Sequence, residues 1–361
     1  MSVRKIGVEE ELLLVDPDTR RLTAVSTQAV AANDGSVEVA EELFLHQIET
    51  STPATVDATE LMQSLRAGRR AVGEAAAAAG ARAVATATPP LPSAMDDEFT
   101  PRTRYARIQA EFGEIARQAT VCAMHVHVDV ADDDEGVAIL DRLAPWLPFL
   151  LAISANSPYC DERDTGHASW RSQVWNRLPT AGPRQAFGDL ASYRAAADRM
   201  IDWGGALDAG MLYFDVRLSE SYPTLEVRVA DVCTDLQDAL LVALVTRALA
   251  ESVAGDPEAE PWRADLLRVA GWRAARYGLA GDLVHPTRSV LAPPRDVFDA
   301  VLKQAGPALE AAGDHEFVVA HFDELMARGT GATRQRRVFE QRGELTAVVD
   351  DLADLTEASW T

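Results

Sequence analysis

Acidic, histidine and arginine side chains alternate with apolar ones along five short segments of this sequence. Side chains of a β-strand point to opposite faces in turn, so residues two apart share a face. Each segment is therefore predicted to be a strand with one apolar face and one face of ionisable groups. The five segments are residues 7–12, 44–49, 124–129, 214–218 and 225–229.

The ionisable faces carry groups that bind metal ions and phosphate. The residues that share a face are Glu9 with Glu11, His125 with His127 and Asp129, Glu226 with Arg228, Asp215 with Arg217, and Gln47 with Glu49. Carboxylate oxygens bind hard cations such as Mg²⁺, and guanidinium groups bind phosphate. Because clustered carboxylates repel one another unless cations neutralise them, we expect bound metal and, with it, a phosphate-bearing substrate.

Each of these patterns alone also has an ordinary structural explanation. Glu-x-Glu is typical of a solvated strand face and His-x-His of a structural pair, while Glu226 with Arg228 could form a surface ion pair worth roughly 0–1 kcal/mol. A solvent-facing sheet would carry Thr, Ser, Lys and Gln in mixture. The acids, histidines and arginines on all five segments favour a single site instead.

The composition excludes several classes of function. The 361 residues include 34 Lys and Arg against 56 Asp and Glu, and the net charge of −22 repels a phosphate backbone, so we expect no nucleic-acid partner. Lys5 and Lys303 are the only lysines. The chain therefore has no Gly-Lys pair for a phosphate-binding loop and no lysine placed to form a Schiff base in a site.

The cysteines and the apolar segments bear on the cellular location. Cys122, Cys160 and Cys233 show no CxxC spacing, which argues against a disulfide framework and for a reducing compartment. We find no apolar signal region near the N-terminus, and the most apolar stretch, residues 239–250, is shorter than the roughly 20 residues that span a bilayer. We therefore expect a cytoplasmic protein with no membrane partner.

Helices and strands are predicted in mixed order along the chain. Apolar spacing and capping residues predict helices at about 57–80, 101–119, 134–155, 189–203, 235–253, 260–277, 294–311 and 333–352. The predicted strands are 5–15, 44–50, 82–88, 121–130, 211–219 and 223–230, the last two forming an antiparallel hairpin. No long linker divides the chain, so we expect one α+β domain over residues 1–361, with helices outside an antiparallel sheet and a helical subregion at 294–361.

Five longer segments resemble the glutamate-cysteine ligase type 2 family, a family of ATP-dependent carboxylate-amine ligases. They are GVEEE at 7–11, CAMHVHV at 122–128, SANSP at 154–158, DTGHASWR at 164–171 and TLEVRV at 224–229. RYGL at 276–279 and GTGATRQR at 329–336 extend the resemblance over nearly the whole chain. The match in order and spacing is specific.

The resemblance implies a glutamine synthetase-like fold. In that fold a curved antiparallel sheet holds ATP, an amino acid and two or three Mg²⁺ ions, or Mn²⁺ in their place, on its concave face. The metal ligands implied by the resemblance are Glu9, Glu11, Glu49, His125 and Glu226. The other implied site residues are His127 at the nucleotide phosphates, Arg228 at the transferred phosphoryl group, and Arg171 and Arg217 as binders of phosphate or of the substrate carboxylate. Glu226 and Arg228 would carry the catalysis, and the family implies a homodimer.

The implied reaction is ligation of glutamate to cysteine, giving γ-glutamylcysteine through an acyl phosphate. Arg217-Leu218-Ser219 stands where Arg-Pro-Ser is common, at the rim of the amine pocket, so glutamate or another carboxylate joined to a different amine is an alternative. A second alternative is a metal-dependent hydrolase, because a His-x-His strand with acids can hold Zn²⁺. A third is a binding protein that keeps the fold without turnover.

Overall fold

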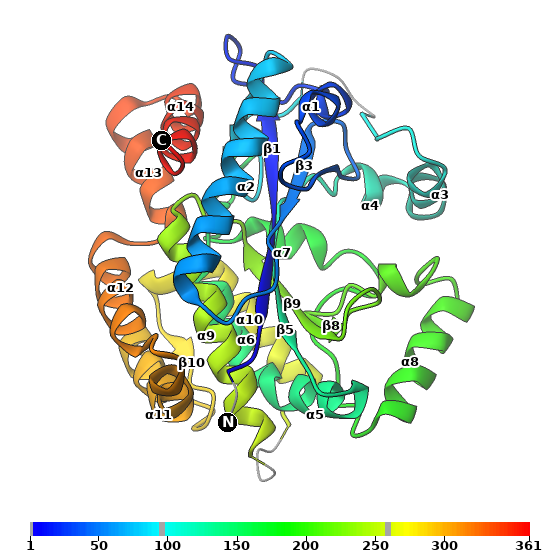
Figure 1. Cartoon of the computed structure of the whole chain (residues 1–361), viewed down its shortest axis with the longest axis vertical. Helices are drawn as coiled ribbons and strands as arrows, with labels where there is room; N and C mark the ends of the chain where they lie inside the picture. The colour runs from blue at the N-terminus through cyan, green and yellow to red at the C-terminus, as the bar shows by residue number, and fades with distance from the viewer. Residues whose placement is uncertain (1–2, 94–97, 257–260) are drawn as a thin grey trace.

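A seven-stranded antiparallel sheet lies at the centre of the computed structural model, which describes residues 3–93, 98–256 and 261–361 (Figure 1). The strands pair in the order β2-β3-β1-β5-β9-β8, and β4 pairs with the far end of β1. Their bounds are β1 Ile6–Val15, β2 Val39–Glu41, β3 Gln47–Ser51, β4 Arg82–Val84, β5 Ala123–Asp129, β8 Val216–Leu218 and β9 Thr224–Asp231. Two short hairpins stand apart from it, β6 Tyr159–Cys160 with β7 Arg163–Asp164 and β10 Leu283–Val284 with β11 Leu291–Ala292.

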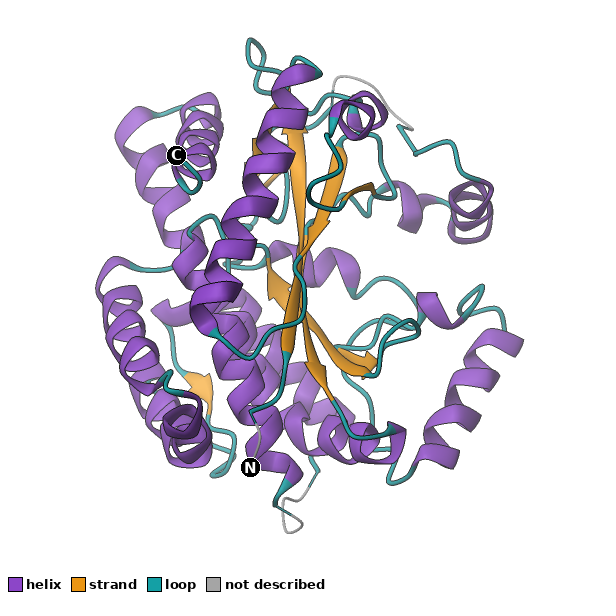
Figure 2. Cartoon of the chain, in the orientation of Figure 1, coloured by secondary structure: helices purple, strands orange, loops and turns teal. Residues whose placement is uncertain are grey.

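Helices make up much of the rest of the chain (Figure 2). The α-helices are α1 Ser26–Ala32, α2 Ala58–Ala78, α3 Thr103–Phe112, α4 Glu114–Arg117, α5 Asp133–Leu143, α6 Leu147–Ser154, α7 Trp170–Trp175, α8 Leu190–Asp202, α9 Leu236–Ala254, α10 Ala264–Tyr277, α11 Pro294–Ala312, α12 His315–Arg328, α13 Gly331–Arg342 and α14 Leu345–Ala358. Three short 3₁₀ segments are η1 Ala144–Trp146, η2 Ala209–Met211 and η3 Gly278–Ala280. In Figure 1, α2 and α9 lie on one side of the strands and α3 and α8 on the other.

The main hydrophobic core lies between the apolar face of the sheet and α9. This helix is apolar nearly all round, and it contacts β5, α2, α5, α6, α11 and α12. A helix with that composition must be buried on every side. Residues 239–250, the most apolar stretch of the sequence, are buried in α9 within the protein core.

Among the described residues, one segment has the length and apolar composition of a membrane-spanning helix. It is Asp133–Ser154, which comprises α5, η1 and α6, and 78% of its most apolar window is buried inside the fold. Pro145 and Pro148 divide it, because a proline ring blocks the backbone hydrogen bond of a continuous helix. The segment therefore packs as core helices around the sheet.

The α+β class and the hairpin of the last two strands are confirmed, since β8 pairs antiparallel with β9. Helix 57–80 is also confirmed, with Asp57 accepting hydrogen bonds from the backbone N–H groups of Thr59 and Glu60. Three predicted helices are wrong in their continuity. Segment 134–155 is divided into α5, η1 and α6, with Pro145 and Pro148 at the division. Segment 101–119 breaks at Gly113 and segment 333–352 at Gly343, where the backbone takes a positive φ that favours glycine.

Several other predicted bounds differ from the structure. Strand 211–219 is reduced to β8, strand 44–50 begins at Gln47, and strand 82–88 ends at Val84. Helix 260–277 begins at Ala264, and residue 260 lies outside the described residues. The sequence analysis did not predict α1, α7, α12 or β2.

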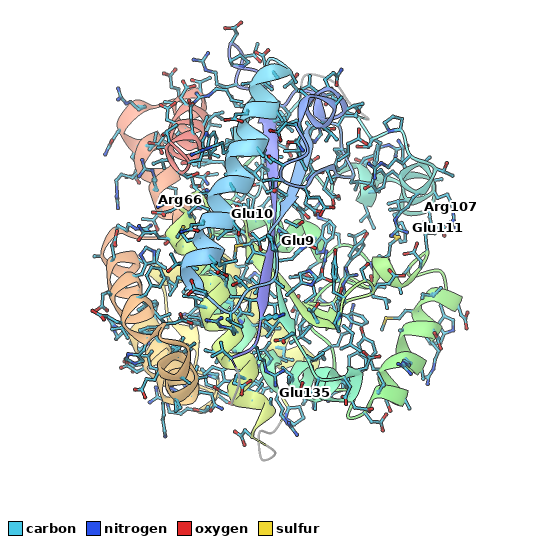
Figure 3. All side chains as sticks on the ribbon, viewed as in Figure 1. Glu9, Glu10, Arg66, Arg107, Glu111 and Glu135 are labelled. Atoms are coloured by element: carbon cyan, nitrogen blue, oxygen red, sulfur yellow. The ribbon has the colours of Figure 1, made fainter. Side chains whose placement is uncertain are left out.

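A buried ion pair holds β1 against α2. Glu10 points away from Glu9 and Glu11, and the labels in Figure 3 place it toward α2. Arg69 of α2 donates to both carboxylate oxygens of Glu10, at 2.6 and 3.0 Å, and to the carbonyl oxygens of Cys233 and Thr234 just after β9. Because Arg69 and Glu10 are at most 1% exposed, this pair fixes β1, α2 and the end of β9 relative to one another.

We predict that Arg69→Met lowers the free energy of unfolding by about 3–5 kcal/mol, because it leaves the Glu10 carboxylate buried without a partner. The double variant Glu10→Leu/Arg69→Met should recover much of the loss. Urea unfolding followed by circular dichroism measures both. The control is Arg82→Met, which removes a more exposed pair with Asp354 and should cost at most about 1 kcal/mol. If Arg69→Met lowers the free energy of unfolding no more than Arg82→Met does, the ion pair of Arg69 with Glu10 does not hold these elements together.

Candidate active site

The register of the sheet sets the predicted ionisable residues side by side on one face. The facing positions are Glu9 with His125, Glu11 with Glu49, His127 with Glu226, and Arg217 with Glu226. Directly opposite residues in antiparallel strands have Cβ atoms about 4.5–5.5 Å apart. Residues from five segments of the sequence therefore form one continuous surface across β3, β1, β5, β9 and β8.

A first group of candidate metal ligands consists of Glu9, His127 and Glu226, whose ligand atoms lie within 4.8 Å of one another. His127 Nδ1 lies 2.9 Å from Thr224 Oγ1, and its Nε2 lies 3.2 Å from Glu9 Oε1 without a hydrogen bond. His125 Nδ1 approaches Glu9 Oε2 at 3.1 Å. The buried Nε2 atoms of both histidines make no hydrogen bond among the described residues, as suits nitrogens that face a cation.

Glu9 and His125 respond to burial in different ways. Burial opposes ionisation of Glu9, but its contacts with His125 and His127 outweigh burial and lower its pKa. Burial, with the positive charge of Arg228, lowers the pKa of His125 to about 4. A neutral imidazole beside an ionised carboxylate is the protonation state in which both groups can donate electron pairs to a metal.

A second group of candidate ligands consists of Glu11, Glu42 and Glu49, also within 4.8 Å of one another. Burial and the charge of Glu42 raise the pKa of Glu11 to about 8, and burial with the charges of Glu42, Glu9 and Glu11 raises the pKa of Glu49 well above its usual value. Three carboxyl groups that lie this close together and are shielded from water repel one another when they are ionised. Their all-oxygen donor set fits a hard divalent cation better than zinc.

Two arginines converge on Glu226. Arg217 donates to both carboxylate oxygens, at 2.7 and 3.2 Å, and Arg228 donates to Oε1. Burial opposes ionisation of Glu226, but the charges of Arg228 and Arg217 outweigh it and lower the pKa of this carboxyl. The guanidinium of Arg228 also lies over the ring of Tyr213, 5.8 Å from its centre. The site thus places two guanidinium groups directly beside the first ligand group.

These residues line a cleft with about 930 Å³ of empty space, its open mouth included. A side chamber of about 1670 Å³, measured the same way, adjoins the cleft, and Lys5, Thr52 and Ser64 are among the residues that line it. The two spaces share Glu9, His127 and Tyr222. The first ligand group therefore lies where the side chamber meets the cleft.

The structure brings eight of the nine residues singled out for the site into the cleft lining. They are Glu9, Glu11, Glu49, His125, His127, Arg217, Glu226 and Arg228. It groups His127, which was expected at the nucleotide phosphates, with Glu9 and Glu226. His125, which was expected as a ligand, lies between the two groups, with its Nδ1 3.8 Å from Glu226 and its Nε2 4.0 Å from Glu11.

Arg171 does not line the cleft, and neither does Asp215, which was expected to share a face with Arg217 but precedes β8. Arg171 is buried on α7 and donates to the carbonyl oxygens of Arg228 and Val229, at 2.9 and 3.2 Å. Asp231, 3.8 Å away, accepts hydrogen bonds from Asn156 N, Ser157 Oγ and Ser169 Oγ. Motif segments 154–158 and 164–171 therefore support the backbone of β9, from which Glu226 and Arg228 project.

Glu42 is a site residue that the sequence analysis missed. It directly follows β2, a strand of three residues that was not predicted. The signal in the sequence is the run of acids Glu38, Glu41 and Glu42 just before segment 44–49. Arg104 and Tyr105 of α3 and Tyr213 of the segment before β8 also line the cleft, and no strand alternation pointed to the two residues of α3.

Comparisons with known proteins identify the family of the chain. The model of glutamate-cysteine ligase family 2 matches residues 5–351. Relatives named "putative glutamate–cysteine ligase 2" include one from Nocardioides sp., 46% identical over 99% of this chain and 97% of its own, and one from Frankia alni, 44% identical over 97% and 96%.

Solved structures agree in fold. Glutamate–cysteine ligase from Francisella tularensis, in complex with AMP, superposes with a TM-score of 0.73 at 12% identity and covers 100% of this chain and 90% of its own. A bifunctional glutathione synthetase from Pasteurella multocida gives 0.73 at 15% identity, covering 99% of this chain and 53% of its own. With a family match over nearly its whole length and relatives above 40% identity, the chain belongs to glutamate-cysteine ligase family 2.

Proposed function

We propose that this chain is an ATP-dependent carboxylate-amine ligase that joins glutamate to cysteine. The observation that carries the proposal is the placement of two groups of metal-ligand side chains directly beside the arginine pair on Glu226. Family membership supports it, as do relatives named for this reaction and an AMP complex of a protein with the same fold.

The residues present fit Mg²⁺, which would be held by Glu9, His127 and Glu226 and by Glu11, Glu42 and Glu49. When bound, the cations would neutralise the negative charge of the ATP phosphates, which the carboxylates alone would repel. The oxygen-rich donor set disfavours the zinc hydrolase alternative.

The side chamber and the cleft would bind different substrates. The side chamber is the larger, and its charged lining residues are Lys5, Glu9, Glu38 and Asp129 among mainly uncharged ones, so it suits the nucleoside part of ATP. The cleft holds Arg104, Arg217 and Arg228 with several acids, so it suits an amino acid with its charged groups. The γ-phosphate would then lie at their junction, near Glu9 and His127.

In the first step the γ-carboxylate of glutamate attacks the γ-phosphorus of ATP, giving γ-glutamyl phosphate and ADP. Arg228 and Arg217 lie on the cleft side of the junction, where they can donate hydrogen bonds to the phosphoryl oxygens in transfer. In the second step the amine attacks the acyl carbon, and phosphate leaves while the amine loses a proton. Burial of Arg228 away from water strengthens its interaction with the developing charge.

We predict that Glu226→Gln and Arg228→Met each lower the rate of ADP formation by about 10²–10³-fold, because each removes a charge that acts on the phosphoryl group or its cation. ADP release is measured with ATP, Mg²⁺, glutamate and cysteine. The control is Glu251→Gln, which removes a carboxylate that pairs with Arg4, away from the cleft. Wild-type rates in a folded Glu226→Gln variant would refute the assignment.

Assays of ADP release with glutamate and a panel of amines test which amine is the second substrate. We expect ADP only when glutamate and cysteine are both present. A different amine that stimulates turnover far more than cysteine would keep the ligase mechanism and replace the second substrate. The absence of ADP with every pairing of carboxylate and amine would overturn the proposed function.

We further predict that stabilisation by Mg²⁺ grows as the pH rises from about 4.5 to about 8. The pKa of Glu11 is about 8 in the fold against 4.5 ordinarily, so the folded protein binds a proton that the unfolded chain releases. The contribution of Glu11 to the free energy of unfolding of the metal-free protein therefore falls across this window, and the raised pKa of Glu49 acts in the same direction. The lowered pKa of His125 acts in the opposite direction below about pH 6.5, so the comparison of Glu11→Gln with the unsubstituted protein isolates the effect of Glu11. Mg²⁺ replaces the proton and reverses the loss.

Thermal unfolding with EDTA or with Mg²⁺, near the two ends of this window, measures the effect. Glu9 and Glu226, whose pKa values are lowered, titrate below it and do not change its sign. Glu11→Gln should reduce both the pH dependence and the Mg²⁺ effect. A Mg²⁺ stabilisation that is equal at both pH values, or unchanged in Glu11→Gln, would argue against a cation on this group.

A further inference from the structure

A third space lies next to the cleft, on the side of α6, α7, α10 and the residues that precede β8. It holds about 920 Å³ of empty space, its open mouth included. Its walls include Trp175, Trp262, Trp272, Phe214, Arg184 and Asp215, and we call it the tryptophan pocket. Leucines of α5 and α6 complete an apolar interior. A largely apolar cavity with a few polar groups is the usual form of a small-molecule site.

Two half-buried side chains of opposite charge, Asp215 and Arg184, line the tryptophan pocket without pairing, and the exposed Arg268 lies in the same lining. Among the described residues, the Asp215 carboxylate makes no hydrogen bond and lies more than 4.0 Å from every cationic nitrogen. Arg184 donates only to the carbonyl oxygens of Ala181, at 3.1 Å, and Pro183, at 3.4 Å, and its buried Nε has no partner. Burial raises the pKa of Asp215 to about 6, while the charges of Arg184 and Arg171 act in the opposite direction.

A third polar group in the same wall also lacks a partner. Trp175 Nε1 is buried and makes no hydrogen bond among the described residues. Leaving a buried polar group unpaired costs about 1–3 kcal/mol, so such groups are rare unless a ligand or water completes them. The tryptophan pocket therefore gathers an acceptor, a cationic donor and an indole donor that a bound molecule could satisfy together.

The charges of Asp215 and Arg184 indicate which class of ligand the tryptophan pocket could bind. A phosphate or other simple anion would face the Asp215 carboxylate, and a simple amine would face the Arg184 guanidinium. A zwitterion satisfies both, with its ammonium at Asp215 and its carboxylate at Arg184. Aromatic and aliphatic walls then suit an apolar side chain, and indole faces also attract an ammonium group.

We propose that the tryptophan pocket is a second amino-acid site, which binds an α-amino acid with an apolar side chain. It is separate from the cleft, which binds its substrates among the ligand groups. Trp175 and Arg228 line both spaces, and the Arg228 N–H donates to the carbonyl oxygen of Asp215 at 2.9 Å. A bound amino acid would therefore contact the same wall that supports the phosphoryl-binding arginine. Binding in this pocket does not depend on the proposed ligase activity.

Binding is tested on the full-length protein by tryptophan fluorescence and by calorimetry, with leucine, methionine and phenylalanine as probes. Matched probes separate the two charges, because N-acetyl-leucine lacks the ammonium and leucinamide lacks the carboxylate. We expect saturable binding of the free amino acids, weakened at least about tenfold in each matched probe. The variants Asp215→Asn and Arg184→Met should each weaken leucine binding by about the same factor.

Glu49→Gln is the control, because it alters the cleft and leaves the tryptophan pocket intact. Leucine binding that persists in Glu49→Gln but falls in Asp215→Asn would support the proposal, whether or not the protein turns over ATP. If Asp215→Asn or Arg184→Met does not fold, Trp272→Ala at the partly exposed mouth takes its place and should also weaken binding. No saturable binding up to about 10 mM, or leucine binding unchanged in every folded pocket variant, would overturn it.

Discussion

The chemistry of this chain depends on the register of β1, because this one strand supplies a carboxylate to each of the two ligand groups. Glu9 and Glu11 face the cleft, and Glu10 between them is tied to Arg69 on the other side. A slip of one residue would send Glu9 and Glu11 into the core and Glu10 into the cleft. The four hydrogen bonds of Arg69 to Glu10, Cys233 and Thr234 oppose that slip.

Strand periodicity was enough to predict most of the candidate site. Glu9, His125 and Glu226 belong to long strands whose other face is mainly apolar, so the period of two placed their side chains correctly. Glu42 and Arg171 could not be placed this way. Glu42 depends on a strand of three residues, and the direction of Arg171 depends on carbonyl groups of β9 that are brought near it only by the fold.

The fold was predicted best where local signals were strong. Asp57 marked the start of α2, and the apolar run of 239–250 marked α9. The breaks at Gly113 and Gly343 were missed because a glycine within an amphipathic pattern is compatible with a continuous helix until tertiary packing selects a positive φ. The helix α12 was missed for a similar reason, since its burial against α9 is a property of the assembled core.

The sheet is open, and both of its edges are short. The outermost strands, β2 and β8, have three residues each, whereas the inner strands β1 and β9 have ten and eight. An exposed edge strand presents unpaired N–H and C=O groups with which another extended chain can pair. A short edge strand presents few such groups. The protein can therefore keep the cleft on the polar face of the sheet open while presenting little backbone for edge-to-edge aggregation.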